Sequence, residues 1–92
     1  SKRVLSVGQC QPDNGALTRF LKSHFDVEVD YTDLPTETLR KIADTQYNLV
    51  LINRKLDADY SDGMDILRSM KDNPATQSLP VMLVTNYAEH QQ

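Results

Sequence analysis

The sequence predicts an α/β fold in which a parallel sheet is covered by helices on both faces. Short apolar runs and helical stretches alternate along the chain, in the order strand, helix, strand, helix, strand, helix, strand. Two of the runs, at 49–52 and 81–85, are continuous and rich in branched side chains, which is typical of strands buried on both faces. Alternation of this kind requires right-handed crossovers between parallel strands.

The first strand is expected at 4–7, a short apolar run that is closed by Gly8. We expect Asp13 or Asn14 to cap the helix that follows, which ends near His24. Its inner face is expected to carry three apolar residues at helical spacing: Leu17, Phe20 and Leu21.

The second strand shows a different pattern from the first. Val27, Val29 and Tyr31 alternate with acidic residues, which predicts a half-exposed strand at the edge of the sheet. Pro35 suits the first turn of the next helix, because its missing N–H has no partner there. The expected inner stripe of that helix is Leu39, Ile42 and Ala43.

The second half of the chain repeats the unit. A helix is expected to open at Ser61-Asp62-Gly63 and to stop at Asn73-Pro74. Its expected inner face is Ile66, Leu67 and Met70. The fourth strand, at 81–85, follows Pro80, and residues 87–92 form a polar tail without a clear period.

Composition indicates one small domain spanning 1–92. The net charge of −3 provides no electrostatic footprint for nucleic acid or an anionic membrane, so neither is an expected partner. Membrane-spanning apolar stretches and a signal peptide are not seen. A lone Cys10 suits a reducing environment, so we expect a cytoplasmic location.

Functional groups in such a fold gather at the carboxyl ends of the strands, near the switch in strand order. In this sequence those ends are 8–10, 53–55 and 85–87. The polar residue Asn53 directly follows the most continuous buried run and is the most informative of them. A carboxamide is a poor nucleophile and carries no charge for holding a metal.

Four segments carry a resemblance to a known family. They are Val4–Val7 followed by Pro12-Asp13-Asn14, then Tyr47–Ile52, then Gly63–Arg68 with Asn73–Thr76, and finally Leu79–Thr85. With these the chain resembles the receiver domain of bacterial two-component response regulators, the CheY-like fold. The resemblance implies a three-layer sandwich with strand order 2-1-3-4-5.

The family uses a defined set of residues for phosphoryl transfer. Two acidic residues after the first strand hold Mg²⁺ with the acceptor aspartate after the third, and a Ser or Thr after the fourth strand senses the phosphoryl group. By resemblance the acidic pair falls on Gly8 and Gln9, the acceptor on Asn53 and the switch hydroxyl on Thr85. None of these three positions, Gly8, Gln9 and Asn53, carries a carboxylate. We therefore expect neither Mg²⁺ binding nor phosphorylation at Asn53.

Two departures from the family concern length. The loop at 54–63 lacks the family's proline and is about two residues longer. The chain ends soon after the fourth strand, so the fourth helix, the fifth strand with its lysine, and the fifth helix are absent. We expect this to expose the edge of the fourth strand, and we expect the natural chain to be longer.

The expected function is that of a receiver-like domain in bacterial signal transduction. It would act by contact with a signalling protein such as a histidine kinase or an output domain, would not be an enzyme, and could form a dimer. Two alternatives stay open. One is a conventional receiver phosphorylated on another acidic residue such as Asp57, and the other is a flavodoxin-like domain that binds a small anion or nucleotide.

Other polar residues have simpler interpretations. Asp57, Asp59 and Asp62 are interpreted as turn-forming and capping residues, because the spacing lacks the bidentate glutamate of a calcium loop. Arg54 and Lys55 could bind an anion but are more typical of a solvated loop. His24 and His90 lack metal-ligand partners at helical spacing.

Overall fold

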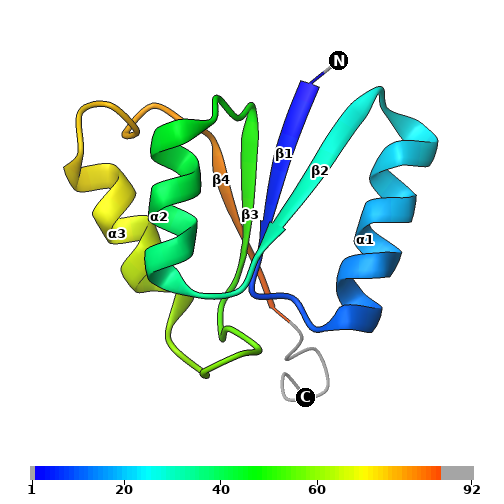
Figure 1. The fold of residues 1–92 in the computed structure, drawn as a ribbon, viewed down its shortest axis with the longest axis horizontal. Helices are drawn as coiled ribbons and strands as arrows, with labels where there is room; N and C mark the ends of the chain where they lie inside the picture. The colour runs from blue at the N-terminus through cyan, green and yellow to red at the C-terminus, as the bar shows by residue number, and fades with distance from the viewer. Residues whose placement is uncertain (1, 86–92) are drawn as a thin grey trace.

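The computed structural model describes residues 2–85, in which strands and helices alternate as expected (Figure 1). The strands are β1 (Lys2–Val7), β2 (Val27–Thr32), β3 (Leu49–Asn53) and β4 (Val81–Val84). The helices are α1 (Gln11–His24), α2 (Pro35–Asp44) and α3 (Gly63–Asp72). Tyr87 and the expected polar tail lie outside the described residues.

The four strands form one parallel sheet in the order β2-β1-β3-β4. Helix α1 lies on one face, while α2 and α3 lie on the other, which gives three layers (Figure 1). Strands β1 and β3 are the central pair, so their carboxyl ends lie beside each other at the point where the strand order reverses. The predicted fold class and strand order are confirmed.

The main core lies between the sheet and the α2–α3 layer. Alternate residues of the central strands point toward these helices, and the helices contribute one buried apolar face each. The buried members are Leu5, Val7, Val50, Ile52, Ile42, Ile66, Met70, Tyr47 and Leu56. This packing fixes the central strands and therefore the loops that leave their carboxyl ends.

Helix α1 begins earlier than expected. Its N-cap is Cys10, which makes no side-chain capping hydrogen bond, so the prediction of an Asp13 or Asn14 cap is wrong. Pro12 occupies the first turn, where its fixed φ favours the helix and its missing N–H costs nothing. Asp13 instead lies in the first turn, where its charge suits the positive end of the helix dipole.

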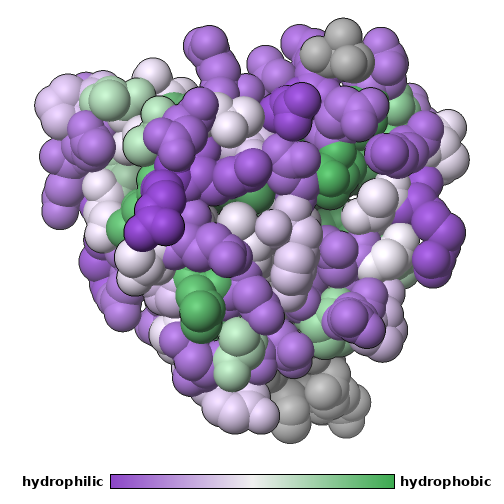
Figure 2. Space-filling view, viewed as in Figure 1, coloured by the Kyte–Doolittle hydropathy of each residue, from purple (hydrophilic) through white to green (hydrophobic). Residues whose placement is uncertain are grey.

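The inner face of α1 is only partly covered. Leu17 and Leu21 are half-buried, Phe20 is 55% exposed, and α1 contains no fully buried residue. The helix packs mainly against β2, at the edge of the sheet. A hollow lined by Leu21, Phe25 and neighbouring strand residues remains beside it, and Figure 2 shows apolar surface between the amino ends of β1 and β2.

The expected stripe of α2 is right at Ile42 and wrong at Leu39 and Ala43, which are exposed. Thr38 faces inward instead and is fully buried. Its hydroxyl donates to the carbonyl oxygen of Leu34 at 2.7 Å and lies 2.9 Å from the hydroxyl of Thr32. A threonine is tolerated inside because both hydrogen bonds satisfy its polar atom.

The predicted bounds of α3 are confirmed, whereas Leu67 of its expected inner face is only half-buried. Asp62 is its N-cap and accepts a hydrogen bond from the backbone N–H of Met64. Ile66 and Met70 are buried, and the helix ends at the Asn73 cap.

Strand β4 is less buried than its apolar sequence predicts. Met82 is 58% exposed, and the other strand residues are half-buried. The strand ends at Val84 and pairs only with β3 among the described residues. Within residues 2–85 β4 therefore lies at one edge of the sheet, opposite β2. Within the described range, no helix is both long and apolar enough to cross a membrane.

Candidate functional site

Asn53 and Gly8 meet at the carboxyl ends of β3 and β1. The side-chain Nδ2 of Asn53 donates a hydrogen bond to the backbone carbonyl oxygen of Gly8 at 3.1 Å, and Asn53 is only 8% exposed. A carboxylate has no hydrogen to donate, so this contact depends on the amide. The structure thus brings together the two positions that sequence resemblance assigned to the acceptor and to the acidic pair.

Gly8 allows the loop after β3 to approach β1 closely. Its φ is +73°, in the left-handed region that favours glycine. A Cβ atom here would lie 2.0 Å from the Cδ2 atom of Leu56, which is far inside van der Waals contact. An aspartate at this position would therefore need both a strained backbone and displacement of Leu56.

Leu56 is the site residue that the sequence analysis missed. It is fully buried, although it stands between the charged residues Lys55 and Asp57 in a polar loop. Next to it, the backbone N–H of Asp57 donates to the carbonyl oxygen of Gly8 at 2.9 Å. A leucine between charged residues of a loop indicates that the loop packs against the core at that point. The sequence does not show where, because Leu56 packs against Gly8, which is far away in the chain.

Gln9, the second acidic-pair position, is buried and neutral. It is 1% exposed, and its Nε2 lies 3.4 Å from the carbonyl oxygen of Val7. Its own carbonyl oxygen lies 2.6 Å from the hydroxyl of Tyr31, which is also 2.9 Å from an Asp33 carboxylate oxygen. Burial, followed by the Asp33 contact, raises the pKa of Tyr31 above its ordinary value, so this hydroxyl stays a hydrogen-bond donor.

The donor set at this site does not fit Mg²⁺. Magnesium prefers oxygen ligands that supply negative charge, whereas Gly8, Gln9 and Asn53 are neutral, and Leu56 fills the adjoining space. Across residues 2–85 there is no group of three or more His, Cys, Asp or Glu residues arranged to hold a metal. The loss of Mg²⁺ binding remains a prediction that this chemistry supports.

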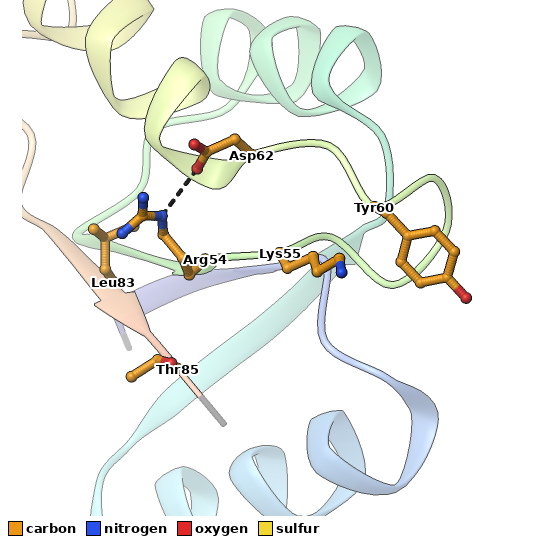
Figure 3. Close-up of a pocket in the computed structure, with 6 residues that line it drawn as sticks. All are labelled: Arg54, Lys55, Tyr60, Asp62, Leu83 and Thr85. Atoms are coloured by element: carbon orange, nitrogen blue, oxygen red, sulfur yellow. Dashed lines mark hydrogen bonds and ion pairs between the residues drawn. The ribbon is translucent and has the colours of Figure 1, made fainter. Parts of the chain in front are cut away.

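Thr85, the predicted switch hydroxyl, follows β4 and is exposed. It lines a hollow of about 550 Å³ at the same end of the sheet (Figure 3). The other described lining residues are Arg54, Lys55, Tyr60, Asp62 and Leu83. Thr85 therefore lies beside the β3–α3 loop, next to the basic residues that follow Asn53.

Two of the acidic loop residues, Asp59 and Asp62, act in a turn and a cap as expected. Asp59 accepts hydrogen bonds from the backbone N–H and the hydroxyl of Ser61, which lower the pKa of its carboxyl. Asp62 accepts from the backbone N–H of Met64 and pairs with Arg54 at 3.0 Å. These contacts hold the pKa of Asp62 below its usual value, with the Met64 hydrogen bond as the largest cause.

Comparison with known proteins supports the fold. No protein-family model and no curated protein sequence matches the chain. Among solved structures, the MaeR response regulator bound to beryllium trifluoride matches with a TM-score of 0.78 and 19% identity, over 94% of this chain and 68% of that one. A response regulator receiver protein from Pseudomonas putida matches with a TM-score of 0.74 and 20% identity, over 91% and 67%.

The anti-anti-sigma factor PhyR from Bartonella quintana also matches, with a TM-score of 0.75 and 19% identity. That match covers 98% of this chain but only 35% of PhyR. The similarity to these structures shows that the chain has the CheY-like receiver fold.

Proposed function

We propose that the chain is a cytoplasmic receiver-fold signalling domain that acts by protein–protein contact, without phosphoryl transfer at Asn53. The hydrogen bond from the Asn53 amide to the Gly8 carbonyl oxygen is the observation that carries this proposal. A phosphoacceptor must present an oxygen nucleophile and, in this fold, hold Mg²⁺. Asn53 instead uses its side chain as a donor to the backbone.

The packing around the site supports the same proposal. Conformational switching in receivers depends on a phosphoryl group that pulls on the hydroxyl after the fourth strand. Here the space above Gly8 is filled by the Leu56 side chain, and the loop is bonded to Gly8 through the backbone of Asp57. The domain would therefore signal from one fixed state or respond to a partner, such as a histidine kinase or an output domain.

Incubation with Mg²⁺ and acetyl phosphate, followed by intact mass spectrometry, tests this proposal. We expect no adduct of about 80 Da, the mass of one added phosphoryl group. A receiver that carries all three acidic residues serves as the positive control under the same conditions. A hydroxylamine-sensitive adduct on this chain would contradict the proposal.

A second candidate function is phosphorylation on Asp57, which one observation favours. The backbone N–H of Asp57 donates to the carbonyl oxygen of Gly8, which holds residue 57 beside Gly8 and Asn53. The Asp57 residue is also exposed. The same mass experiment on an Asp57→Asn variant separates the two candidates. Under our proposal neither the variant nor the unmodified chain gains mass when the phosphodonor is added, whereas an adduct on the unmodified chain that is lost in the variant would favour Asp57.

A further inference from the structure

Tyr60 has an unusual backbone conformation in the loop between β3 and α3. Its φ is +60°, and it is the only non-glycine residue with a positive φ among the described residues. Its side chain is 71% exposed. Bulky residues rarely adopt this conformation, and such outliers concentrate at functional sites.

The local structure shows why another residue would suit this position better. The backbone N–H of Tyr60 donates to the carbonyl oxygen of Leu56 at 2.8 Å, which closes one helical turn at a left-handed residue. Glycine or asparagine normally takes the left-handed position at the end of a helical turn. Because the tyrosine ring is mostly exposed, burial of the ring offers little compensation for its backbone conformation.

Backbone hydrogen bonds and the buried Leu56 hold the two ends of the loop in place, so the loop backbone that carries the Tyr60 ring is well ordered by contacts. Leu56 is fully buried, and its backbone N–H donates to the carbonyl oxygen of Ser61 at 2.9 Å. The backbone N–H of Gly63 donates to the carbonyl oxygen of Arg54 at 2.7 Å, and Lys55 and Asp62 form an antiparallel bridge. A preorganised aromatic side chain loses little conformational freedom on binding.

Charge around the ring points to the chemistry of a partner. The Nζ atom of Lys55 lies 5.2 Å from the centroid of the Tyr60 ring. Figure 3 shows Lys55 running toward Tyr60, whereas Arg54 runs the other way to its ion pair with Asp62. Among the described residues that line the hollow beside them, Arg54 is paired with Asp62, which leaves Lys55 as the cation next to the ring. Asp57 and Asp59 of the same loop are exposed but do not belong to this described lining.

We propose that Tyr60 and Lys55 form a docking surface for a partner protein. The partner would offer an apolar pocket for the Tyr60 ring and an acidic side chain for Lys55. Tyrosine in a preformed loop is a common anchor at the centre of protein interfaces, and a neighbouring cation selects an acidic partner. This inference rests on the proposed function and names the surface through which it acts.

Two variants separate binding from folding. Tyr60→Asn removes the ring but retains a residue that tolerates the left-handed conformation. We expect its unfolding midpoint to equal or exceed that of the unmodified chain, while partner binding falls at least tenfold. Lys55→Gln should slow association and weaken its dependence on salt, without a change in fold.

Site-specific photocrosslinking in the native cells provides the test. A photocrosslinking amino acid replaces Ala58, an exposed residue of the same loop, or Phe20 on α1 as a matched exposed control. The inference predicts one partner crosslinked at position 58, whose affinity for the purified chain falls at least tenfold with Tyr60→Asn.

Four outcomes would overturn this inference. Unchanged affinity of the Tyr60→Asn variant would show that Tyr60 does not serve binding. An unfolding midpoint below that of the unmodified chain would show that Tyr60 stabilises the fold, which removes the structural argument for a binding role. Crosslinks at position 20 alone would reject this surface and leave the proposed function standing. No crosslink at either position would count against both.

Discussion

The amide of Asn53 donates to the backbone carbonyl oxygen of Gly8 across 3.1 Å, linking the ends of the two central strands. The family resemblance assigns these two positions to acidic residues that would share a cation. Here they share a neutral hydrogen bond. The contact therefore links β1 and β3 directly, and under the proposed function it takes the place of a metal between them.

Asn53→Asp should destabilise the fold. At neutral pH the carboxylate would be buried against the Gly8 carbonyl oxygen without a hydrogen to donate, which costs about 1–3 kcal/mol. Urea denaturation measures this loss. Asn53→Ala is the control and should lose less, because Gly8 keeps its hydrogen bond from Asp57.

The pH dependence of the Asn53→Asp variant tests the cause of that loss. Burial should raise the pKa of the new carboxyl above its unfolded value, so the protonated form is favoured in the folded state. Stability relative to the unmodified chain should then recover as the pH falls toward 4 (about the ordinary carboxyl value). A loss that is constant with pH would contradict this cause.

Gly8→Ala should be destabilising through its contact with Leu56. The added methyl group would overlap the Leu56 side chain, and φ at this position is +73°. We expect a loss of about 1–3 kcal/mol from overpacking, measured by urea denaturation.

Leu56→Ala provides the matching half of a double-mutant cycle. Alone it should cost about 2–5 kcal/mol, because the residue is fully buried. The Gly8→Ala, Leu56→Ala double variant should lose less than the sum of the two single losses, since the smaller side chain makes room for the methyl group. Strict additivity would show that Leu56 does not determine the choice of glycine.

Asp30 and Tyr47 make the stability depend on pH at both extremes. The Tyr47 hydroxyl donates to Asp30 at 2.6 Å, and Arg3 pairs with the same carboxylate at 3.0 Å. The hydrogen bond from Tyr47 is the largest cause that lowers the pKa of Asp30. Burial opposes it, and the hydrogen bond and charge of Arg3 lower the pKa further. Its contribution to stability is therefore present above the unfolded pKa of about 4 and is lost as the pH falls through the folded value.

Tyr47 shows the opposite dependence. Burial, followed by the Asp30 contact, raises the pKa of Tyr47 to about 12. Its stabilising effect is present below the unfolded pKa of about 10 and is lost as the pH rises through 12. Urea denaturation from acid to alkaline pH should show both limbs in the unmodified chain. Tyr47→Phe should reduce the alkaline limb, to which Tyr31 also contributes, and should flatten the acid limb. Equal profiles would contradict the assignment.

Much of the fold could be predicted from periodicity, because buried strands and amphipathic helices leave local patterns. The edge position of β2 and the start of α3 at Asp62 follow from such patterns. The assignment of Gly8 and Asn53 to the acidic pair and the acceptor comes from the family resemblance instead and stays a prediction. The Leu56 anchor is not, because its burial depends on contact with a distant glycine. The exposure of Leu39 does not follow from periodicity, because Thr38 turns inward instead and has its hydroxyl satisfied by Leu34 and Thr32.

The most direct test of the central claim is the phosphorylation of the Asn53→Asp variant. Restoring one carboxylate leaves Gly8 and Gln9 neutral and leaves Leu56 above Gly8. Intact mass spectrometry after incubation with Mg²⁺ and acetyl phosphate should therefore show the same mass with and without the phosphodonor. An adduct of about 80 Da on Asp at position 53 would show that the rest of the phosphorylation site still functions and would contradict the account.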